Sequence, residues 1–499
     1  MSLKGRPVAV AAVYLGTFMA TLAISIVSVA LPAIQAGLQT SMAGLQWVVG
    51  AYTLCLSAFM LSAGPLADRY GRKRVWLGGV SLFTLGSAVC AFAGSLTVLI
   101  IGCSLQGIAG ALVIPGALSI LTQAYPDPAE RAHIIGGWSS FSAVSLILGP
   151  MLGGFMVDQA GWPSIFLLNL PIGAVTFALG FISIEESSNP DHAALDPAGQ
   201  VLSIVFLGSL TLGLINAGQS GWAAFEAVVP LAVAVIALCA FILVEMNVKR
   251  PVLPVDLFKQ RPFASANFAS FVLGFSGYTS LFLFSLFLQR GQGWSATEAG
   301  WRMAPVFAAM LVVASCFGTL AKRFGVNQLM VGGYVLIGVS MTAMLSFSSM
   351  TSYMTIALLF ALLGVGLGLA VPSTGAAAMA SAPRERTGTA SATMNALRQG
   401  GMTIGIALLG TLMSVRAVNV LEKSLSYLDV GDMRESAAFA IRMHEKPANL
   451  DVDTGIFNQL LTEALAQGFT LAAIVAGILG FMAALILAYS TYKVRSTAD

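Results

Sequence analysis

Long apolar segments fill most of this 499-residue chain, and their length restricts the fold more than any other feature. A helix needs about 20 mostly apolar residues to cross the hydrocarbon core of a bilayer. Only 9% of the residues are charged, against about 25% in soluble domains, so lipid must cover most of the surface. We therefore predict an all-α integral membrane protein with 14 transmembrane helices. They are expected at about 8–34, 45–66, 75–94, 97–124, 133–157, 163–184, 197–217, 224–246, 264–288, 299–320, 328–348, 354–380, 387–415 and 468–490.

The composition excludes several classes of function. A net charge of +3 is too small to indicate binding to nucleic acid. The five cysteines and three histidines show no metal-ligand spacing, and the chain contains no Walker P-loop for ATP. We therefore expect no cofactor, no metal and no enzymatic activity, and we expect the lipid bilayer to be the main surroundings of the chain.

The distribution of basic residues predicts the orientation in the membrane. Lys and Arg favour cytoplasmic loops, so the N-terminus, with Lys4 and Arg6, is placed in the cytoplasm. An even number of spans returns the C-terminus, with Lys493 and Arg495, to the same side. The other loops on this side hold Arg69, Arg72, Lys73, Arg74, Arg131, Lys249, Arg250, Lys259, Arg261, Lys322, Arg323, Arg384 and Arg386.

The opposite side carries few basic residues in its short loops. Beyond Arg290 and Arg302 these loops hold almost none. A long outer loop of mixed charge is predicted at about 416–467, and it includes a candidate amphipathic segment near IFNQLLTEALAQGF. Long loops contribute little to the charge rule, so this loop does not alter the predicted orientation.

Two stretches of the chain resemble each other and divide it into halves. GPLADRYGRK, from Gly64, and GTLAKRFGVN, from Gly318, share Gly, Leu, Ala, Arg and Gly in register, with an aromatic residue after the Arg. Each follows the second span of a six-span block, and duplicated halves are common among transporters. We predict an N-terminal half at 1–190, a two-helix insert at 191–255 and a C-terminal half at 256–499. Chance similarity between apolar helices is the alternative.

The charged loop GPLADRYGRKRV is the most specific motif. Gly64 and Gly71 permit a sharp turn and a close approach, and Asp68 suits a helix N-terminus or an arginine partner. Its basic residues are Arg69, Arg72, Lys73 and Arg74. A loop that only sets the topology would need the positive charges alone, so the acid and the glycines indicate a further function.

A second motif, LGPMLGG, closes the fifth predicted span. Gly149, Pro150, Gly153 and Gly154 allow a kink and very close contact between backbones. Ordinary packing through small residues is the alternative. The two interpretations are compatible, because a helix that rocks needs packing that can slide or bend.

Together with four further stretches, these motifs resemble the major facilitator superfamily. GPLADRYGRKRV resembles the signature loop of that superfamily. LQWVVGAYTL, GWPSIFLLNLPIG, PVLPVDLF and SAPRERTGTASATMNALRQGGMTIGIALLG resemble segments of its fourteen-span drug:proton antiporter branch. They correspond to the second span, the sixth span, the loop after the two extra helices, and the thirteenth span with its preceding loop. The resemblance covers nearly the whole chain.

The resemblance implies a fold, a function and a latch. The implied fold has two six-helix halves plus two extra helices. The implied function is export of hydrophobic or amphipathic small molecules in exchange for protons, by a monomer that alternates its access in the bacterial inner membrane. The signature loop would latch the halves together on the cytoplasmic side through Asp68 and Arg72, with Arg131 or the end of a partner helix as counterpart. The implied latch residues are Gly64, Asp68, Arg69, Gly71, Arg72, Arg74 and Arg131. In the same family LGPMLGG is associated with exporters.

The chain departs from the family at two positions. The first span of relatives carries an Asp where this chain has Ala23, and the fourth span carries an Arg where it has Cys103. Losing only one partner would leave a costly unpaired charge in the bilayer, whereas losing both is tolerable. No other Asp or Glu falls near the centre of a predicted span. Proton coupling could use Glu245 or Glu298 only if the predicted boundaries are wrong by a turn.

Because no acid falls near the centre of a predicted span, three functions remain open. The first is drug efflux coupled to protons, as the resemblance implies. The second is an uncoupled or differently coupled transporter of a specific metabolite, with an anion among the options. The third is a receptor or scaffold that transports nothing, against which the intact signature loop argues.

The polar residues at membrane depth predict where the substrate binds. Thr21, Ser25 and Ser28 share one face of the first span, which looks either to a central cavity or to a neighbouring helix such as the fifth. Arg398 is the one charge well inside a predicted span, and it either meets an anionic group or bonds backbone carbonyls. The candidate cavity residues are Ser25, Trp47, Tyr52, Gln106, Phe275, Tyr278, Asn395, Arg398 and Gln399. For most of the aromatic ones, packing is the alternative.

Overall fold

The computed structural model describes residues 6–125, 127–188, 196–248, 253–383, 386–426, 433–448, 450 and 452–496. These residues form helices and connections, with no strand among them. The helices include 14 that are long and apolar enough to cross a membrane, as predicted. Of the predicted inner basic residues, Lys4, Lys249, Arg250 and Arg384 lie outside the described residues, as do the side chains of Lys493 and Arg495. The predicted boundary at 190 and 191 also lies outside them.

The first seven helices form the N-terminal part of the bundle, and two more form the insert. The N-terminal helices are α1 (Arg6–Leu38), α2 (Met42–Tyr70), α3 (Arg72–Ala91), α4 (Leu96–Ala124), α5 (Pro128–Ala160), α6 (Ser164–Leu167) and α7 (Asn169–Ser183). The insert consists of α8 (Pro197–Ser220) and α9 (Phe225–Asn247). Ser41 and Ser95 cap the N-termini of α2 and α4, because each serine side chain accepts a hydrogen bond from a backbone N–H in the first turn.

The remaining helices form the C-terminal part. They are η2 (Leu257–Lys259), α10 (Arg261–Val272), η3 (Leu273–Tyr278), α11 (Ser280–Leu286), η4 (Phe287–Gly291), α12 (Ala296–Arg302), α13 (Ala304–Phe324), α14 (Val326–Ala343), η5 (Met344–Ser346), α15 (Tyr353–Ala380), α16 (Thr387–Ser426), α17 (Met433–Met443) and α18 (Thr454–Ser496). Elements α10 to η4 together make one span, in which η3 and η4 are π-helical. Such π segments are often found at functional sites.

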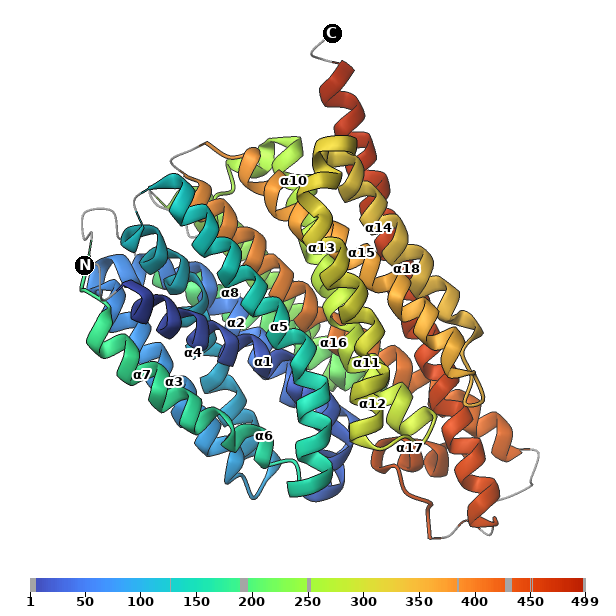
Figure 1. Cartoon of the computed structure of the whole chain (residues 1–499). Coiled ribbons are helices and arrows are strands. Elements are labelled where there is room, and N and C mark those ends of the chain that lie inside the picture. The colour runs from blue at the N-terminus through green and yellow to red at the C-terminus, as the bar shows by residue number, and fades with distance from the viewer. Residues whose placement is uncertain are drawn as a thin grey trace.

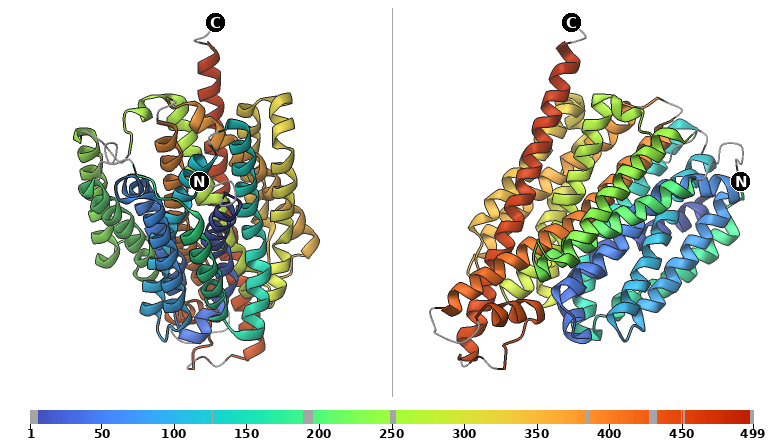
Figure 2. Two further views of the ribbon diagram at one scale, coloured as in Figure 1. Left: turned by 60° about the vertical axis from the view of Figure 1, so that its left-hand side comes forward. Right: turned by 180° about the vertical axis from the view of Figure 1, so that it is seen from behind.

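The two parts of the bundle converge at one end and diverge at the other (Figure 1). We call the end that holds the first residues of α1 the terminal end, and the opposite end, which holds α12 and α17, the α17 end. The insert lies along the contact between α2 and α16, and its helices cross the face of the bundle between them (Figure 2, right). Gln200 on α8 donates to the Ala58 carbonyl on α2, and Thr411 on α16 donates to the Leu214 carbonyl on α8. The insert therefore bonds to both parts.

The predicted long loop at 416–467 is wrong in extent. Helix α16 continues to Ser426, α17 occupies part of the interval, and α18 already begins at Thr454, so the predicted amphipathic segment is the start of α18. Ala417, Leu421 and Leu425 are buried at a spacing of four residues, which continues the helix past the last strongly apolar window. The nearby charges lowered the local hydropathy without ending the helix.

Candidate functional site

At the α17 end, α5 and α12 pack backbone against backbone. A Cβ atom at Gly154 would collide with the Ala296 carbonyl oxygen, and one at Gly300 would collide with that of Pro150. Asp158 also accepts a hydrogen bond from the Thr297 backbone N–H, at 2.8 Å. Only glycine permits this contact between the N-terminal and the C-terminal part of the bundle.

The other glycines of LGPMLGG pack against α1. A Cβ atom at Gly149 would collide with Ser25 Oγ, and one at Gly153 would lie 2.6 Å from Ile26 Cγ1. The motif therefore places α5 in close contact with two partners, α1 on one side and α12 on the other. Pro150 lies inside α5, directly after Gly149 and before Gly153.

A proline in α1 leaves one carbonyl free to form a second junction at the α17 end. Pro32 lies within α1 and has no N–H, so the carbonyl of Ser28 four residues earlier lacks its usual helical donor. Ser285 on α11 supplies that hydrogen bond from its Oγ at 2.6 Å. Next to it, Gln289 Nε2 donates to the Val29 carbonyl at 3.0 Å.

Arginine extends this junction toward the end of α1. Arg290 Nη2 donates to the Pro32 carbonyl at 3.1 Å and to Gln35 Oε1 at 3.2 Å. Gln35 in turn donates to the carbonyl of Arg442 on α17, at 3.1 Å. Burial, together with the charge of Arg290, lowers the pKa of the neighbouring His444 to about 3, so His444 is neutral at neutral pH. His444, just after α17, therefore adds no second positive charge beside Arg290.

The terminal end is open by comparison. Figure 1 shows α5 and α13 diverging toward this end. Val144 and Leu148 on α5 and Leu311 and Val312 on α13 are exposed. The two parts of the bundle thus meet firmly at the α17 end and separate toward the terminal end along this side.

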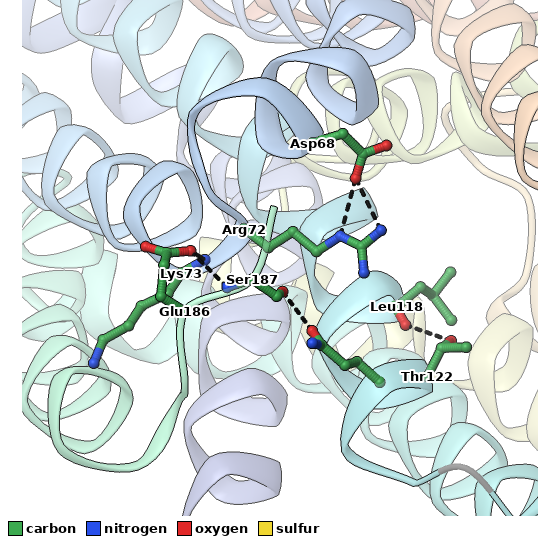
Figure 3. Close-up of polar contacts among 8 residues, drawn as sticks. Asp68, Arg72, Lys73, Leu118, Thr122, Glu186 and Ser187 are labelled. Atoms are coloured by element: carbon green, nitrogen blue, oxygen red, sulfur yellow. Dashed lines mark hydrogen bonds and ion pairs between the residues drawn. The ribbon is translucent and has the colours of Figure 1, made fainter. Parts of the chain in front are cut away.

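The signature loop is held within its own part of the bundle (Figure 3). Arg72 donates from Nε to Asp68 Oδ1 at 3.0 Å, and Nη2 lies 2.9 Å from the same oxygen. Glu186, which follows α7, accepts hydrogen bonds from the backbone N–H groups of Lys73 and Arg74 at the start of α3. A carboxylate at this position stabilises the positive end of the α3 dipole. Among the described residues no ion pair joins Asp68 to Arg131.

Gly71 and Gly64 of this loop differ in whether the structure requires a glycine. Gly71 has a φ of +104°, and a Cβ there would lie 2.6 Å from the Glu186 carboxyl group, so both backbone and space require glycine. The expectation of a turn or close approach at Gly64 is wrong. Helix α2 continues through Gly64 to Tyr70, and no atom lies within 4 Å of a Cβ built there.

Sequence reasoning missed Glu186 and Ser187. The Ser187 carbonyl accepts from the Arg72 backbone N–H at 2.8 Å, and its hydroxyl bonds Gln123 on α4. Both residues lie more than 110 positions after the loop that they hold, and no motif marks them. An acid just after an apolar span was the available signal, since such an acid can cap a nearby helix.

The two residues that depart from the family pattern lie beside one small cavity. Ala23 and Cys103 line a small cavity with Tyr52 and Gln106, and this cavity of about 10 Å³ is near the smallest that holds a water. Gln106 donates to Ser87 at 2.7 Å, and Tyr52 donates to the Ala20 carbonyl at 2.8 Å. The site is therefore neutral, hydrogen-bonded and nearly filled.

Some candidate cavity residues lie elsewhere. Ser25 is fully buried between α1 and α5, and its hydroxyl donates to the Leu22 carbonyl at 3.2 Å, so the hydroxyl face of α1 looks to the fifth span. Thr21 bonds Ser145 of α5. Trp47 packs against the insert near Leu214. In this structure both side chains pack between helices, and their place at a substrate cavity stays a prediction.

The C-terminal part brings three candidates together. Arg398 bonds the Asn395 side chain one turn earlier on α16, and its guanidinium lies 5.5 Å from the Tyr278 ring centroid on η3. Close packing of η3 on α16 permits this, since a Cβ at Gly274 would collide with the Arg398 carbonyl. Gln399 is buried on the next position of α16, and Phe275 is buried and packs against Phe271.

Carboxylates do not reach the middle of any described span. Glu298 belongs to a capping box in the first turn of α12, and Glu245 near the end of α9 accepts from the Leu253 backbone N–H. The described carboxylate furthest inside a span, Glu463, accepts from Ser349 in the connection before α15. The two acids considered for proton coupling therefore lie at helix ends.

Comparison with known proteins assigns the chain to a family. The model of the Major Facilitator Superfamily matches residues 13–406. The chain belongs to the major facilitator superfamily. Three characterised relatives and one solved structure extend this assignment.

The relatives are named for resistance and export. The multidrug resistance protein Stp of Mycobacterium tuberculosis is 37% identical over 82% of this chain and 76% of its own length. The methylenomycin A resistance protein of Bacillus subtilis is 33% identical over 86% and 92%. The tetracenomycin C resistance and export protein of Streptomyces glaucescens is 30% identical over 98% and 92%. A bacterial homolog of the human lysosomal transporter Spinster shares the fold, with a TM-score of 0.62 at 18% identity over 98% of this chain and 99% of that chain.

Proposed function

We propose that this chain exports hydrophobic or amphipathic small molecules, drugs among them, by alternating access. The observation that carries the proposal is the asymmetry of the bundle. The two parts are bonded at the α17 end through Ser285, Gln289 and Arg290, and they diverge at the terminal end. Alternating access requires such a junction to open while the opposite one closes. Relatives of this superfamily named for multidrug resistance and export support the same function.

The terminal end is assigned to the cytoplasm, and the conformation is therefore inward-open. The helix ends at this side of the bundle include Arg69, Arg72, Lys73, Lys322 and Arg323, and such basic residues are typical of the cytoplasmic side of membrane proteins. The protein then acts as a monomer in the bacterial cytoplasmic membrane with both termini inside. Closing the terminal end would bring the loop of Asp68 and Arg72 against the other part of the bundle, as the latch hypothesis expects.

Two forms of coupling remain as proposals, exchange for protons and transport without them. The arrangement of carboxylates favours the second, since proton carriage across a membrane normally uses an acid at membrane depth. Among the described residues Glu245 and Glu298 lie at helix ends, and Glu463 lies ten residues into α18, where it accepts from Ser349. Ala23 and Cys103 supply no charge.

Transport by purified protein tests both points. Protein in liposomes is offered a panel of hydrophobic and amphipathic drugs, with and without an imposed pH gradient. We expect uptake above that of protein-free liposomes, and an initial rate that does not follow the gradient. A rate that rises and falls with the gradient would establish proton exchange. No uptake of any drug would favour the third function, a receptor or scaffold without transport.

A further inference from the structure

Arg398 places a positive charge inside the membrane without an acidic partner. It lies 11 residues after the start of α16, roughly 16 Å along the axis of a helix that is long and apolar enough to cross a membrane. The ion pairs of the described residues all lie at helix ends, in the pairs Arg72–Asp68, Arg74–Glu186 and Arg386–Asp256. Unpaired charges at this depth are costly and usually functional.

The guanidinium of Arg398 has donors to spare. It carries five N–H groups. One nitrogen, Nη2, bonds Asn395, and the buried Nε has no hydrogen-bond partner among the described residues. The Tyr278 ring lies beside the group, and the side chain as a whole is only partly buried. A planar acceptor could therefore bond the free nitrogens while an attached ring lies near Tyr278.

The small cavity of the N-terminal part offers a cation no carboxylate. It is lined by uncharged residues, among them Ala23, Tyr52 and Cys103. Toward the α17 end, Arg290 bonds carbonyl and amide oxygens of α1, and Arg302 lies over the Trp294 ring, 3.5 Å from its centroid. The positive charges of Arg290, Arg302 and Arg398 favour anions over cations at these places.

We propose that this transporter moves organic anions with an apolar, aromatic body, and that Arg398 holds the anionic group while Tyr278 packs against the ring. The proposal rests on the export function proposed above and names its substrate class. Guanidinium groups bond carboxylates and sulfonates in a bidentate manner. A positively charged substrate would meet an unpaired like charge at the same place, which gives selectivity by repulsion.

The same charge supplies a driving force that needs no proton. An anion that leaves a compartment with a negative interior moves down the membrane potential. For one charge this corresponds to about 50-fold accumulation outside per 100 mV. Export of anions by simple alternating access is therefore driven by the potential and needs no carboxylate that carries a proton.

Matched probes test the proposal. Pyrene-1-sulfonate and a pyrene trimethylammonium salt share an aromatic body, carry permanent opposite charges and cross lipid poorly. Each is loaded into liposomes that contain the wild-type protein, and a potassium diffusion potential or a pH gradient is imposed separately. We expect the sulfonate to leave faster as the interior becomes more negative, while the ammonium salt leaves at the rate of protein-free liposomes.

Three variants assign the effect to the side chain. Arg398→Gln should slow sulfonate efflux by about 10- to 100-fold, the value of hydrogen bonds to a charged group, and Arg398→Lys should retain part of it. Arg416→Gln is the matched control, because Arg416 lies on the same helix but is exposed near its other end. It should transport as the wild type does. If Arg398→Gln does not purify as folded protein, Arg398→Lys must still prefer the sulfonate.

Several results would overturn the proposal. They are equal transport of the ammonium salt, sulfonate transport that follows the pH gradient alone, or an unchanged charge preference in folded Arg398→Gln. Transport of a drug from the earlier panel, with neither pyrene probe moved, would leave export intact and reject the anion class. Failure of every compound would reject both proposals.

Discussion

The two ends of the bundle use polar groups in opposite ways. At the α17 end, Ser285 and Arg290 cross from one part of the bundle to the other and bond main-chain carbonyls of α1. At the terminal end, Arg72 and its neighbours bond groups within the same part, with Asp68 and Glu186 as acceptors. The closed end is therefore built mainly from carbonyl acceptors and glycine contacts, with Asp158 as a carboxylate acceptor, and the open end keeps its charges for local pairs.

This difference has a physical reason. A junction that opens and closes must expose its polar groups to water in one state and bury them in the other. Carbonyl groups beside Pro32 cost less to bury than carboxylates do, because they carry no full charge. Paired charges that stay near solvent, such as Asp68 and Arg72 at 31% and 26% exposure, are in turn worth little to stability. Each end thus uses the groups that suit its exposure.

The largest expected effect comes from breaking the glycine contact at the closed end. Gly154→Val should drive α5 from α12, because even a Cβ collides with Ala296. Overpacking costs about 1–3 kcal/mol, which is about 5- to 150-fold in the ratio of closed to open conformations. The measurement is labelling of an Ile34→Cys reporter by an impermeant maleimide added at the α17 end, in a background without the five native cysteines.

The control for this prediction lies on the same helix. No atom lies within 4 Å of a Cβ built at Gly136, so Gly136→Val should leave the labelling rate near that of the unmodified reporter. Equal labelling in the two valine variants would show that the contact between Gly154 and Ala296 does not hold this end closed.

A smaller increase in the labelling rate is expected from the loss of one hydrogen bond. Ser285→Ala leaves the Ser28 carbonyl buried without a donor, since Pro32 cannot supply one. An unsatisfied buried group costs about 1–3 kcal/mol, and the open conformation avoids that cost by hydration. Faster labelling of the same reporter is therefore expected. Ser276→Ala is the matched control, because Ser276 makes a similar buried bond to Ala476 within its own part, and it should lower thermal stability without faster labelling.

Part of this architecture could be read from the sequence, because it depends on local properties. The length of apolar segments determines the spans, and it predicted 14 of them correctly. The same averaging over windows placed the end of α16 too early, although Ala417, Leu421 and Leu425 continued the helical spacing. Hydropathy averages respond to nearby charges, whereas a helix ends only where its hydrogen bonding and packing end.

The junctions depend on pairs of residues far apart in the chain, and these could be predicted only in part. The glycines of LGPMLGG predicted close backbone contact, yet Ala296 as the partner of Gly154 lies 142 positions later and has no marking motif. Glu186 was missed for the same reason. Gly64 was misjudged because a motif glycine suggests a turn even where the helix continues. The roles of the latch and cavity residues stay predictions.

The smallest effect on the closed α17 end is expected from a change at the open terminal end. This change is also the sharpest test of the difference between the two ends. Asp68→Asn removes a partly exposed pair worth at most about 1 kcal/mol, so thermal stability and labelling at the α17 end should change little. Transport should still fall, because the latch hypothesis assigns Asp68 to the conformation in which the terminal end closes.

Asp256→Asn is the matched control, since its pair with Arg386 is exposed and carries no latch role. Wild-type transport by folded Asp68→Asn would remove the latch assignment, and an equal loss in both variants would attribute it to surface charge. A transport defect confined to Asp68→Asn, with an unchanged α17 end, would show that the two ends are closed by different groups in different conformations.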